Sequence, residues 1–173
     1  MTELTLKADA SSVDSEPSVE GLQLATLTVY DLPALASLSL VAYKQRLTAE
    51  NFWRATDEMR LYFEGALGTP RDDSFIGAWL DGELVGAVFC VLDAPFDDVP
   101  RGPFVLDLMV DPEHRRRGIA TALVAELSQR TRDWGYDSVT LRLDMKQMPE
   151  AFNLYRRLGF APIAEEIKEE HRV

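Results

Sequence analysis

Residues 104 to 120 combine a strand pattern with a basic, glycine-containing turn. Phe104 to Val110 is short and almost continuously apolar, with Asp107 its only charge, which predicts a strand buried on both faces. Three arginines and Gly118 follow and lead into an amphipathic helical pattern. The first turn of a helix has N–H groups without partners, its dipole adds positive potential, and Gly118 would let a ligand approach the backbone closely. This combination predicts a site for a pyrophosphate.

The predicted pyrophosphate site differs from two common nucleotide-binding loops. No lysine follows the glycine as in GxxxxGKS/T, and GxGxxG is absent. For each arginine of the run, contact with solvent and contact with a ligand are equally compatible with the pattern. The backbone amides of the turn need no particular side chain, so they are the stronger candidates for anion binding.

The charge of the chain is unevenly distributed. Residues 115 to 157 contain nine basic and five acidic residues, a local balance of +4, whereas the whole chain carries −11, so the remainder carries −15. A duplex is bound by clustered cations that displace its counterions, and this net charge therefore argues against general nucleic-acid binding. The pattern favours a small polyanion held by the basic segment and a cationic second ligand drawn to the acidic remainder.

The rest of the sequence predicts the elements that would position this turn. Residues 1 to 20 are expected to form a flexible acidic tail, apart from a short strand that Leu4 and Leu6 could form, and residues 21 to 173 a single domain. A proline-rich loop is expected over residues 93 to 103. Hydrophobic periodicity predicts strands near 22–29, 74–80, 83–92, 104–110, 138–143 and within 160–167, and helices near 31–44, 48–63, 118–134 and 149–159. This order indicates a mixed sheet with helices on both faces.

Composition excludes several other classes. Cys90 is the only cysteine, so an internal disulfide and a multi-cysteine metal site are excluded, and a reducing compartment is favoured. His114 and His171 are too few and too isolated for a metal site. No run approaches the ~20 apolar residues of a membrane helix, and the N-terminus lacks a basic region followed by an apolar run. We therefore expect a cytoplasmic protein that binds neither metal nor membrane.

Two motifs resemble those of the GNAT superfamily of N-acetyltransferases. The motif V-x-P-x-x-R/Q-x-x-G-I/V/L-G/A matches at Val110, Pro112, Arg115, Gly118, Ile119 and Ala120. The motif A-x-x-L-Y-x-x-x-G-F matches at Ala151, Leu154, Tyr155, Gly159 and Phe160. The similarity covers roughly residues 22 to 165. It implies an α/β GNAT-like fold, with a central mixed and splayed sheet of about six to seven strands and helices on both faces, and an acetyl-CoA-dependent N-acetyltransferase.

The resemblance also implies the residues that bind the coenzyme. Backbone amides from Arg116 to Thr121 would bind the pyrophosphate, and the adjacent strand would pair with the pantetheine arm where it splays from the strand at 138–143. The implied set is Leu108, Met109, Val110, Arg115, Arg116, Arg117, Gly118, Ile119, Ala120 and Thr121. Met148 stands where the family often has an asparagine that contacts the coenzyme, and Asn153 is a candidate for that contact instead.

Two residues are candidates for the chemistry of acetyl transfer. Tyr155 matches the position that in many family members protonates the leaving thiolate, although an aromatic ring packed under the coenzyme fits the same motif. Asp107 is a candidate general base, or a buried carboxylate that bonds to the backbone or anchors the substrate ammonium; Leu106 stands where some members carry glutamate. Asp144 is a weaker candidate base.

The acceptor is the open part of the prediction. The acidic remainder of the chain favours a small cationic amine, while a protein or peptide acceptor and an acyl-CoA sensor without turnover are the alternatives, and a homodimer is compatible with all three. The segments 44–74 and 93–103 are expected to line the acceptor pocket. Their candidate aromatic residues are Phe52, Trp53, Tyr62 and Phe96, although a stripe of this kind is also typical of a core.

Overall fold

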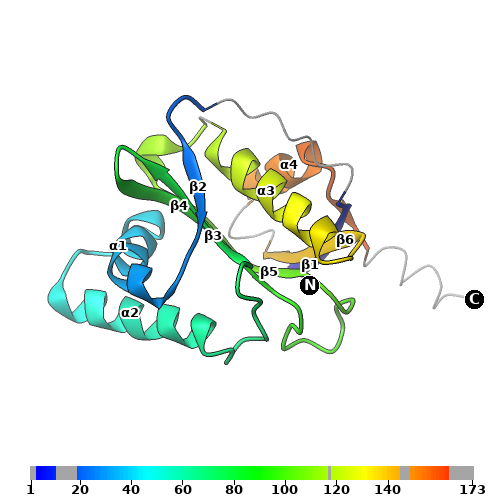
Figure 1. The fold of residues 1–173 in the computed structure, drawn as a ribbon, viewed down its shortest axis with the longest axis horizontal. Coiled ribbons are helices and arrows are strands. Elements are labelled where there is room, and N and C mark those ends of the chain that lie inside the picture. The colour runs from blue at the N-terminus through cyan, green and yellow to red at the C-terminus, as the bar shows by residue number, and fades with distance from the viewer. Residues whose placement is uncertain (1–2, 11–18, 117, 145–148, 164–173) are drawn as a thin grey trace, which may run out of the picture.

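A single sheet, covered by helices on both faces, forms the fold (Figure 1). The computed structural model describes residues 3–10, 19–116, 118–144 and 149–163. The strands are β1 (Glu3–Asp9), β2 (Gln23–Thr26), β3 (Phe75–Leu80), β4 (Glu83–Val91), β5 (Phe104–Val110), β6 (Ser138–Asp144) and β7 (Ala161–Pro162). The helices are α1 (Leu32–Ala42), α2 (Ala49–Phe63), α3 (Ile119–Asp133) and α4 (Pro149–Arg157), with 3-10 turns at Val29–Asp31 and Pro112–His114. In the described residues no helix is both long and apolar enough to span a membrane.

The sheet is mixed, as the sequence predicts. Its order is β2-β3-β4-β5-β6-β1-β7, in which β5 and β6 are parallel and the other pairs are antiparallel. Helices α1 and α2 pack on one face over Phe89 and Met109, and α3 and α4 pack on the other over Val88 and Val139. Alternate residues of the central strands thus enter two separate cores, which is why β4 and β5 are apolar almost throughout.

The N-terminal strand contains Leu4 and Leu6, where the sequence allows a short strand within the expected acidic tail over residues 1 to 20. Glu3–Asp9 lies inside the sheet and pairs with β6 from Glu3↔Asp144 to Asp9↔Ser138. Leu6 is fully buried, because the alternation of apolar and polar residues over this short segment directs one row of side chains into the core. Residues 11–18 lie outside the described part of the chain.

Helix α3 approaches the sheet closely because a glycine lies beneath it. A Cβ atom added at Gly86 on β4 would stand 2.9 Å from Ile119 Cγ2 and 3.0 Å from Leu123 Cδ1. The missing side chain lets the first turn of α3 rest directly on β4. The start of α3, which follows the predicted pyrophosphate turn, is therefore fixed against the centre of the sheet.

Candidate active site

A β-bulge in β5 determines which way Asp107 points. Phe89 pairs with Asp107, but its neighbour Cys90 pairs with Val105, so Leu106 is an extra residue in β5. As a result Leu106 and Asp107 both lie on the face covered by α1 and α2, while Val105 and Leu108 enter the opposite core. Strict alternation would have directed Asp107 into that opposite core.

The carboxylate of Asp107 accepts hydrogen bonds from two tyrosines. The hydroxyl of Tyr43, at the end of α1, donates a short hydrogen bond to Asp107 Oδ1. The hydroxyl of Tyr62, on α2, lies 3.5 Å from Asp107 Oδ2 in a longer hydrogen bond. Each carboxylate oxygen thus faces one phenol, and the three side chains come from three different elements.

Burial dominates the electrostatics of this cluster. It raises the pKa of Asp107 above the usual range of an aspartate, while the hydrogen bonds from Tyr43, Tyr62 and the Leu108 backbone act in the opposite direction. Burial and the neighbouring carboxylate also raise the pKa of both phenols, so both keep their protons at neutral pH. The cluster can therefore hold a carboxylate with increased proton affinity between two neutral donors.

Tyr155 lies close enough to this cluster to be affected by its charge. It is buried on α4, and its ring contacts Phe160 edge to face at a centroid distance of 5.6 Å. Burial raises the pKa of its phenol, and the negative charge of Asp107 raises it further. The phenol is therefore protonated at neutral pH, which is compatible with both the acid and the packing interpretation.

Strands β5 and β6 separate beside Asp107. They pair at Phe104↔Thr140 and Val105↔Leu141, and their remaining described residues are not paired with each other. Leu108, Met109 and Val110 lie beyond the last pair, so β6 leaves this edge of β5 unpaired, apart from Val110 O, which accepts a hydrogen bond from Arg115 Nε. This confirms the predicted splay of the sheet.

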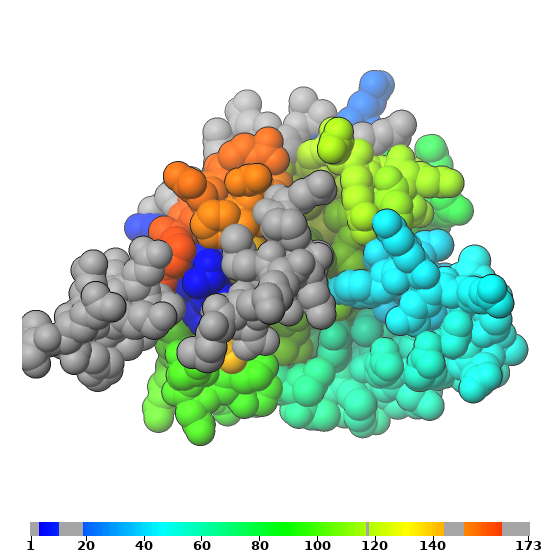
Figure 2. Space-filling view, turned by 180° about the vertical axis from the view of Figure 1, so that it is seen from behind, coloured from blue at the N-terminus to red at the C-terminus, as the bar shows by residue number. Residues whose placement is uncertain are grey.

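The turn before α3 has the backbone expected of an anion site. Gly118 is the residue before α3 and has a left-handed φ of +89°, which favours glycine. The first i to i−4 bond runs from Ala122 N–H to Gly118 O, so the N–H groups of Ile119, Ala120 and Thr121 precede the ladder. Figure 2 shows the yellow-green segment that contains this turn against the cyan end of α1.

The basic side chains around the turn differ in their surroundings. Arg115 Nη2 donates to Ala42 O at 3.0 Å and its Nε donates to Val110 O at 3.3 Å, so its guanidinium contacts the protein's own carbonyls. Arg115 and Arg116 are both exposed, and so is Asn153 on α4. Arg117, Met148 and His171, and the side chain of Asp144, lie outside the described residues.

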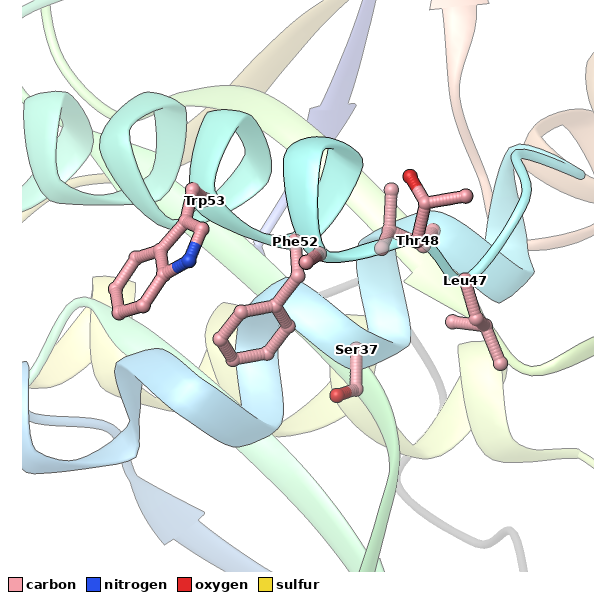
Figure 3. Close-up of a pocket in the computed structure, with 7 residues that line it drawn as sticks. Ser37, Leu47, Thr48, Phe52 and Trp53 are labelled. Carbon is pink, nitrogen blue, oxygen red and sulfur yellow. The ribbon is translucent and has the colours of Figure 1, made fainter.

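The four aromatic candidates for the acceptor pocket lie in three places. Tyr62 contacts Asp107, whereas Phe96 lies beside Phe104 and under the guanidinium of Arg142, 4.6 Å from its ring centroid. Phe52 and Trp53 line a shallow hollow between α1 and α2 (Figure 3). The remaining residues that line this hollow are Ser37, Leu40, Leu47, Thr48 and Ala49.

Tyr43 is the site residue that the sequence analysis missed. It is separated from Asp107 by 64 residues, and its only sequence signal is its place at the end of a predicted helix.

Cys90 is fully buried, and burial raises the pKa of its thiol to about 12, as expected for a core residue. Within the described ranges, no three His, Cys, Asp or Glu side chains form a group that could hold a metal ion.

We expect Asp107→Asn to raise the melting temperature at neutral pH. The pKa of Asp107 is higher in the folded than in the unfolded protein, so the fold is more stable when Asp107 is protonated. That stability is lost as the pH rises through the folded-state pKa and Asp107 becomes charged. Asparagine keeps the shape without the charge. The difference in melting temperature between Asp107→Asn and the parent should therefore shrink as the pH falls and Asp107 is protonated. Thermal unfolding from about pH 4 to about pH 9 measures this difference.

Asp98→Asn is the matched control for this experiment. A hydrogen bond from Arg142 lowers the pKa of the exposed Asp98, so this carboxylate contributes stability above its unfolded pKa and loses it as the pH falls. Its replacement should lower the melting temperature slightly at neutral pH. If Asp107→Asn gave the same shift at every pH, the raised pKa of Asp107 would be wrong.

Comparison with known proteins agrees with these features. A profile of the acetyltransferase (GNAT) family matches residues 40–160, more than half of the chain. N-acetyltransferase 8 of Homo sapiens is 49% identical over 53 residues, which is 31% of this chain and 23% of that protein. N-acetyltransferase 8 of Rattus norvegicus is 37% identical over 98 residues, 55% of this chain and 42% of that protein. The matched regions span less than half the length of these relatives.

A solved structure shares the fold at low sequence identity. The crystal structure of PH1933 from Pyrococcus horikoshii OT3 superimposes with a TM-score of 0.65 at 18% identity, covering 79% of this chain and 86% of that chain. At this identity the likeness concerns the fold alone. The region matched by the family profile contains the open edge of β5, the glycine turn and Tyr155, and from this match we conclude that the chain belongs to the acetyltransferase (GNAT) family.

Proposed function

We propose that this protein transfers the acetyl group of acetyl-CoA to the primary amine of a small cationic acceptor. The observation that carries this proposal is the Asp107 carboxylate, which lies between the phenols of Tyr43 and Tyr62. It stands on β5 where the edge of that strand toward β6 is no longer paired. An ammonium group is attracted to such a carboxylate, and aromatic rings beside it add to the attraction. The site thus has a place for each of the two substrates.

The coenzyme fits the turn and the open strand edge. The N–H groups at the start of α3 would bind its pyrophosphate, since Gly118 adds no side chain at this approach. Leu108 to Val110 would bond to the amides of the pantetheine arm. When bound, the coenzyme supplies an acetyl group activated as a thioester.

Asp107 would bind the acceptor's ammonium and take up its proton, directly or through a water molecule. An amine attacks only after it loses its proton, and a base whose pKa is raised toward neutrality accepts that proton more readily than an ordinary aspartate. Tyr43 and Tyr62 would hold the carboxylate in place during this step. The same contacts would fit a purely anchoring role, which predicts a weaker effect on the rate of the chemical step.

Tyr155 would donate a proton to the sulfur that leaves. Its buried phenol remains protonated at neutral pH, because burial and the charge of Asp107 both raise its pKa. The same low-polarity surroundings would also increase the proton affinity of a thiolate that forms beside it. A neutral phenol at this place can therefore stabilise the departing sulfur.

Tyr155→Phe tests this role. The substitution keeps the ring and removes only the hydroxyl, so kcat should fall by ~100-fold or more while the dissociation constant of acetyl-CoA stays within about threefold. Steady-state rates at saturating acceptor and calorimetry with acetyl-CoA measure the two quantities. An unchanged kcat, with chemistry limiting turnover, would return Tyr155 to a packing role.

Gly118→Val tests the coenzyme site. A valine at this left-handed position would block the approach of the pyrophosphate and should weaken acetyl-CoA binding by ~10-fold or more, or about 1.4 kcal/mol. Gly135→Val is the matched control, because Gly135 also has a left-handed φ, of +93°, at the other end of α3, and a Cβ there meets nothing within 4 Å. Normal binding by a folded Gly118→Val protein in calorimetry would exclude the turn as the pyrophosphate site.

The charge of the acceptor is tested with amines of matched size. Because the chain outside residues 115 to 157 carries −15, cationic amines should be preferred over neutral and anionic ones. Their kcat/KM should fall as salt rises, since salt screens charges beyond ~8 Å at physiological ionic strength. A preference for anionic amines or peptides would contradict the small cationic acceptor. Acetyl-CoA binding without acceleration by any amine would favour an acyl-CoA sensor.

We place the protein in the cytoplasm. Its single cysteine, Cys90, is buried in β4, which is compatible with a reducing compartment.

A further inference from the structure

Helix α1 ends in a way that leaves one carbonyl in need of a partner. Lys44 adopts a left-handed φ of +56°, Gln45 N–H donates to Leu40 O at 2.8 Å, and Lys44 N–H donates to Val41 O at 3.3 Å. These bonds form a Schellman motif, which satisfies the carbonyls of the last turn except those nearest the end. The carbonyl of Ala42, the last residue of α1, accepts no bond within this motif.

Arg115 supplies the missing donor for Ala42. Its Nη2 lies 3.0 Å from Ala42 O, and its Nε lies 3.3 Å from Val110 O. One planar guanidinium therefore joins the end of α1 to the end of β5. Its positive charge also lies at the negative end of the α1 dipole, which strengthens the contact.

The two carbonyls that Arg115 binds belong to the elements that carry the Tyr43–Asp107 hydrogen bond. Tyr43 follows Ala42 directly, and Asp107 lies on β5 three residues before Val110. Movement of either element end would change the distance between the phenol and the carboxylate. Both hydrogen bonds of the Arg115 side chain thus go to backbone carbonyls of the protein, and the guanidinium points toward the ends of α1 and β5.

We infer that the side chain of Arg115 is a positioning residue, which holds Tyr43 on Asp107 and thereby links the coenzyme turn to the acceptor site. This inference rests on the proposed function for its kinetic consequences. The guanidinium is then not a phosphate ligand, and the anion is bound by the backbone of the turn that begins at Arg115. Coenzyme bound on this turn would be joined to the acceptor carboxylate through a single side chain.

The kinetic test combines two substitutions. Arg115→Lys keeps the charge but removes the planar fork that reaches both carbonyls. At saturating acetyl-CoA we expect it to lower kcat/KM for the amine by ~10-fold, with the dissociation constant of acetyl-CoA changed by less than about threefold. Tyr43→Phe should have a similar effect, and the double variant should be no worse than Tyr43→Phe alone, since both act on one contact. Arg132→Lys, an exposed arginine near the end of α3, is the control and should leave both quantities unchanged.

A second test needs no activity. Without the Tyr43 hydrogen bond the charged carboxylate of Asp107 is less well stabilised, so Asp107→Asn should raise the melting temperature at neutral pH more in the Arg115→Lys background than in the parent. The groups that bond to this carboxylate are Tyr43 after α1, Tyr62 on α2 and the Leu108 backbone, and Tyr155 on α4 lies near enough to be affected by its charge. Arg115→Gln, which can still donate to one carbonyl, replaces Arg115→Lys if that variant does not fold.

The outcomes separate the two roles of Arg115. A rise of ~10-fold or more in the dissociation constant of acetyl-CoA, with kcat/KM for the amine unchanged at saturating coenzyme, would make the side chain a phosphate ligand and overturn the inference. Independent, additive effects of Arg115→Lys and Tyr43→Phe, or an equal gain from Asp107→Asn in both backgrounds, would overturn it as well. If the parent protein failed to bind acetyl-CoA, the proposed function would fail, while the stability cycle would still test the inference.

Discussion

The partial burial of one carboxylate is the constraint on which the rest of the site depends. Removing a charged group from water is costly unless donors replace the lost hydration, and Tyr43 and Tyr62 provide those donors at Asp107. Both phenols reach the carboxylate because Asp107 pairs with Phe89 on the face covered by α1 and α2, next to the extra residue Leu106. The fold thereby keeps a group of increased proton affinity at the place where β5 separates from β6. We expect a neutral residue to make this part of the structure more stable, and a stability cost of this kind is typical of functional sites.

In the proposed function, the two substrates use different parts of the structure around β5. The turn at Gly118 and the unpaired edge of β5 would serve an anionic, amide-containing ligand, and the carboxylate of Asp107 would serve a cation. The charge distribution along the chain has the same division, with +4 in residues 115 to 157 and −15 elsewhere. Arg115 joins the two halves, because it leads into the turn and also binds the end of α1. Under the proposed function, a change at one substrate site would therefore reach the other through the side chain of Arg115.

Local sequence signals predicted the elements around the proposed coenzyme site far better than the contacts around Asp107. The strand over 104–110, the glycine turn and the start of α3 follow each other directly, so periodicity and two short motifs located all of them. The contact of Tyr43 with Asp107 spans 64 residues, and it depends on a bulge that no periodicity indicates. The place of β1 between β6 and β7 was missed for the same reason, since strand pairing is decided by distant partners. The role of Tyr155 and the coenzyme contacts of Asn153 and Arg116 remain predictions.

The titration of Asp107 tests the central claim most directly. The carboxyl carbon of Asp107 can be followed by ¹³C NMR as the pH is varied, and the spectrum of Asp107→Asn assigns its resonance. The account predicts a midpoint clearly above the ~3.9 of an unperturbed aspartate, because burial outweighs the hydrogen bonds from the two tyrosines. A midpoint at or below that value would mean that the carboxylate is well solvated or fully compensated. In that case Asp107 would have no increased affinity for the proton of an acceptor amine.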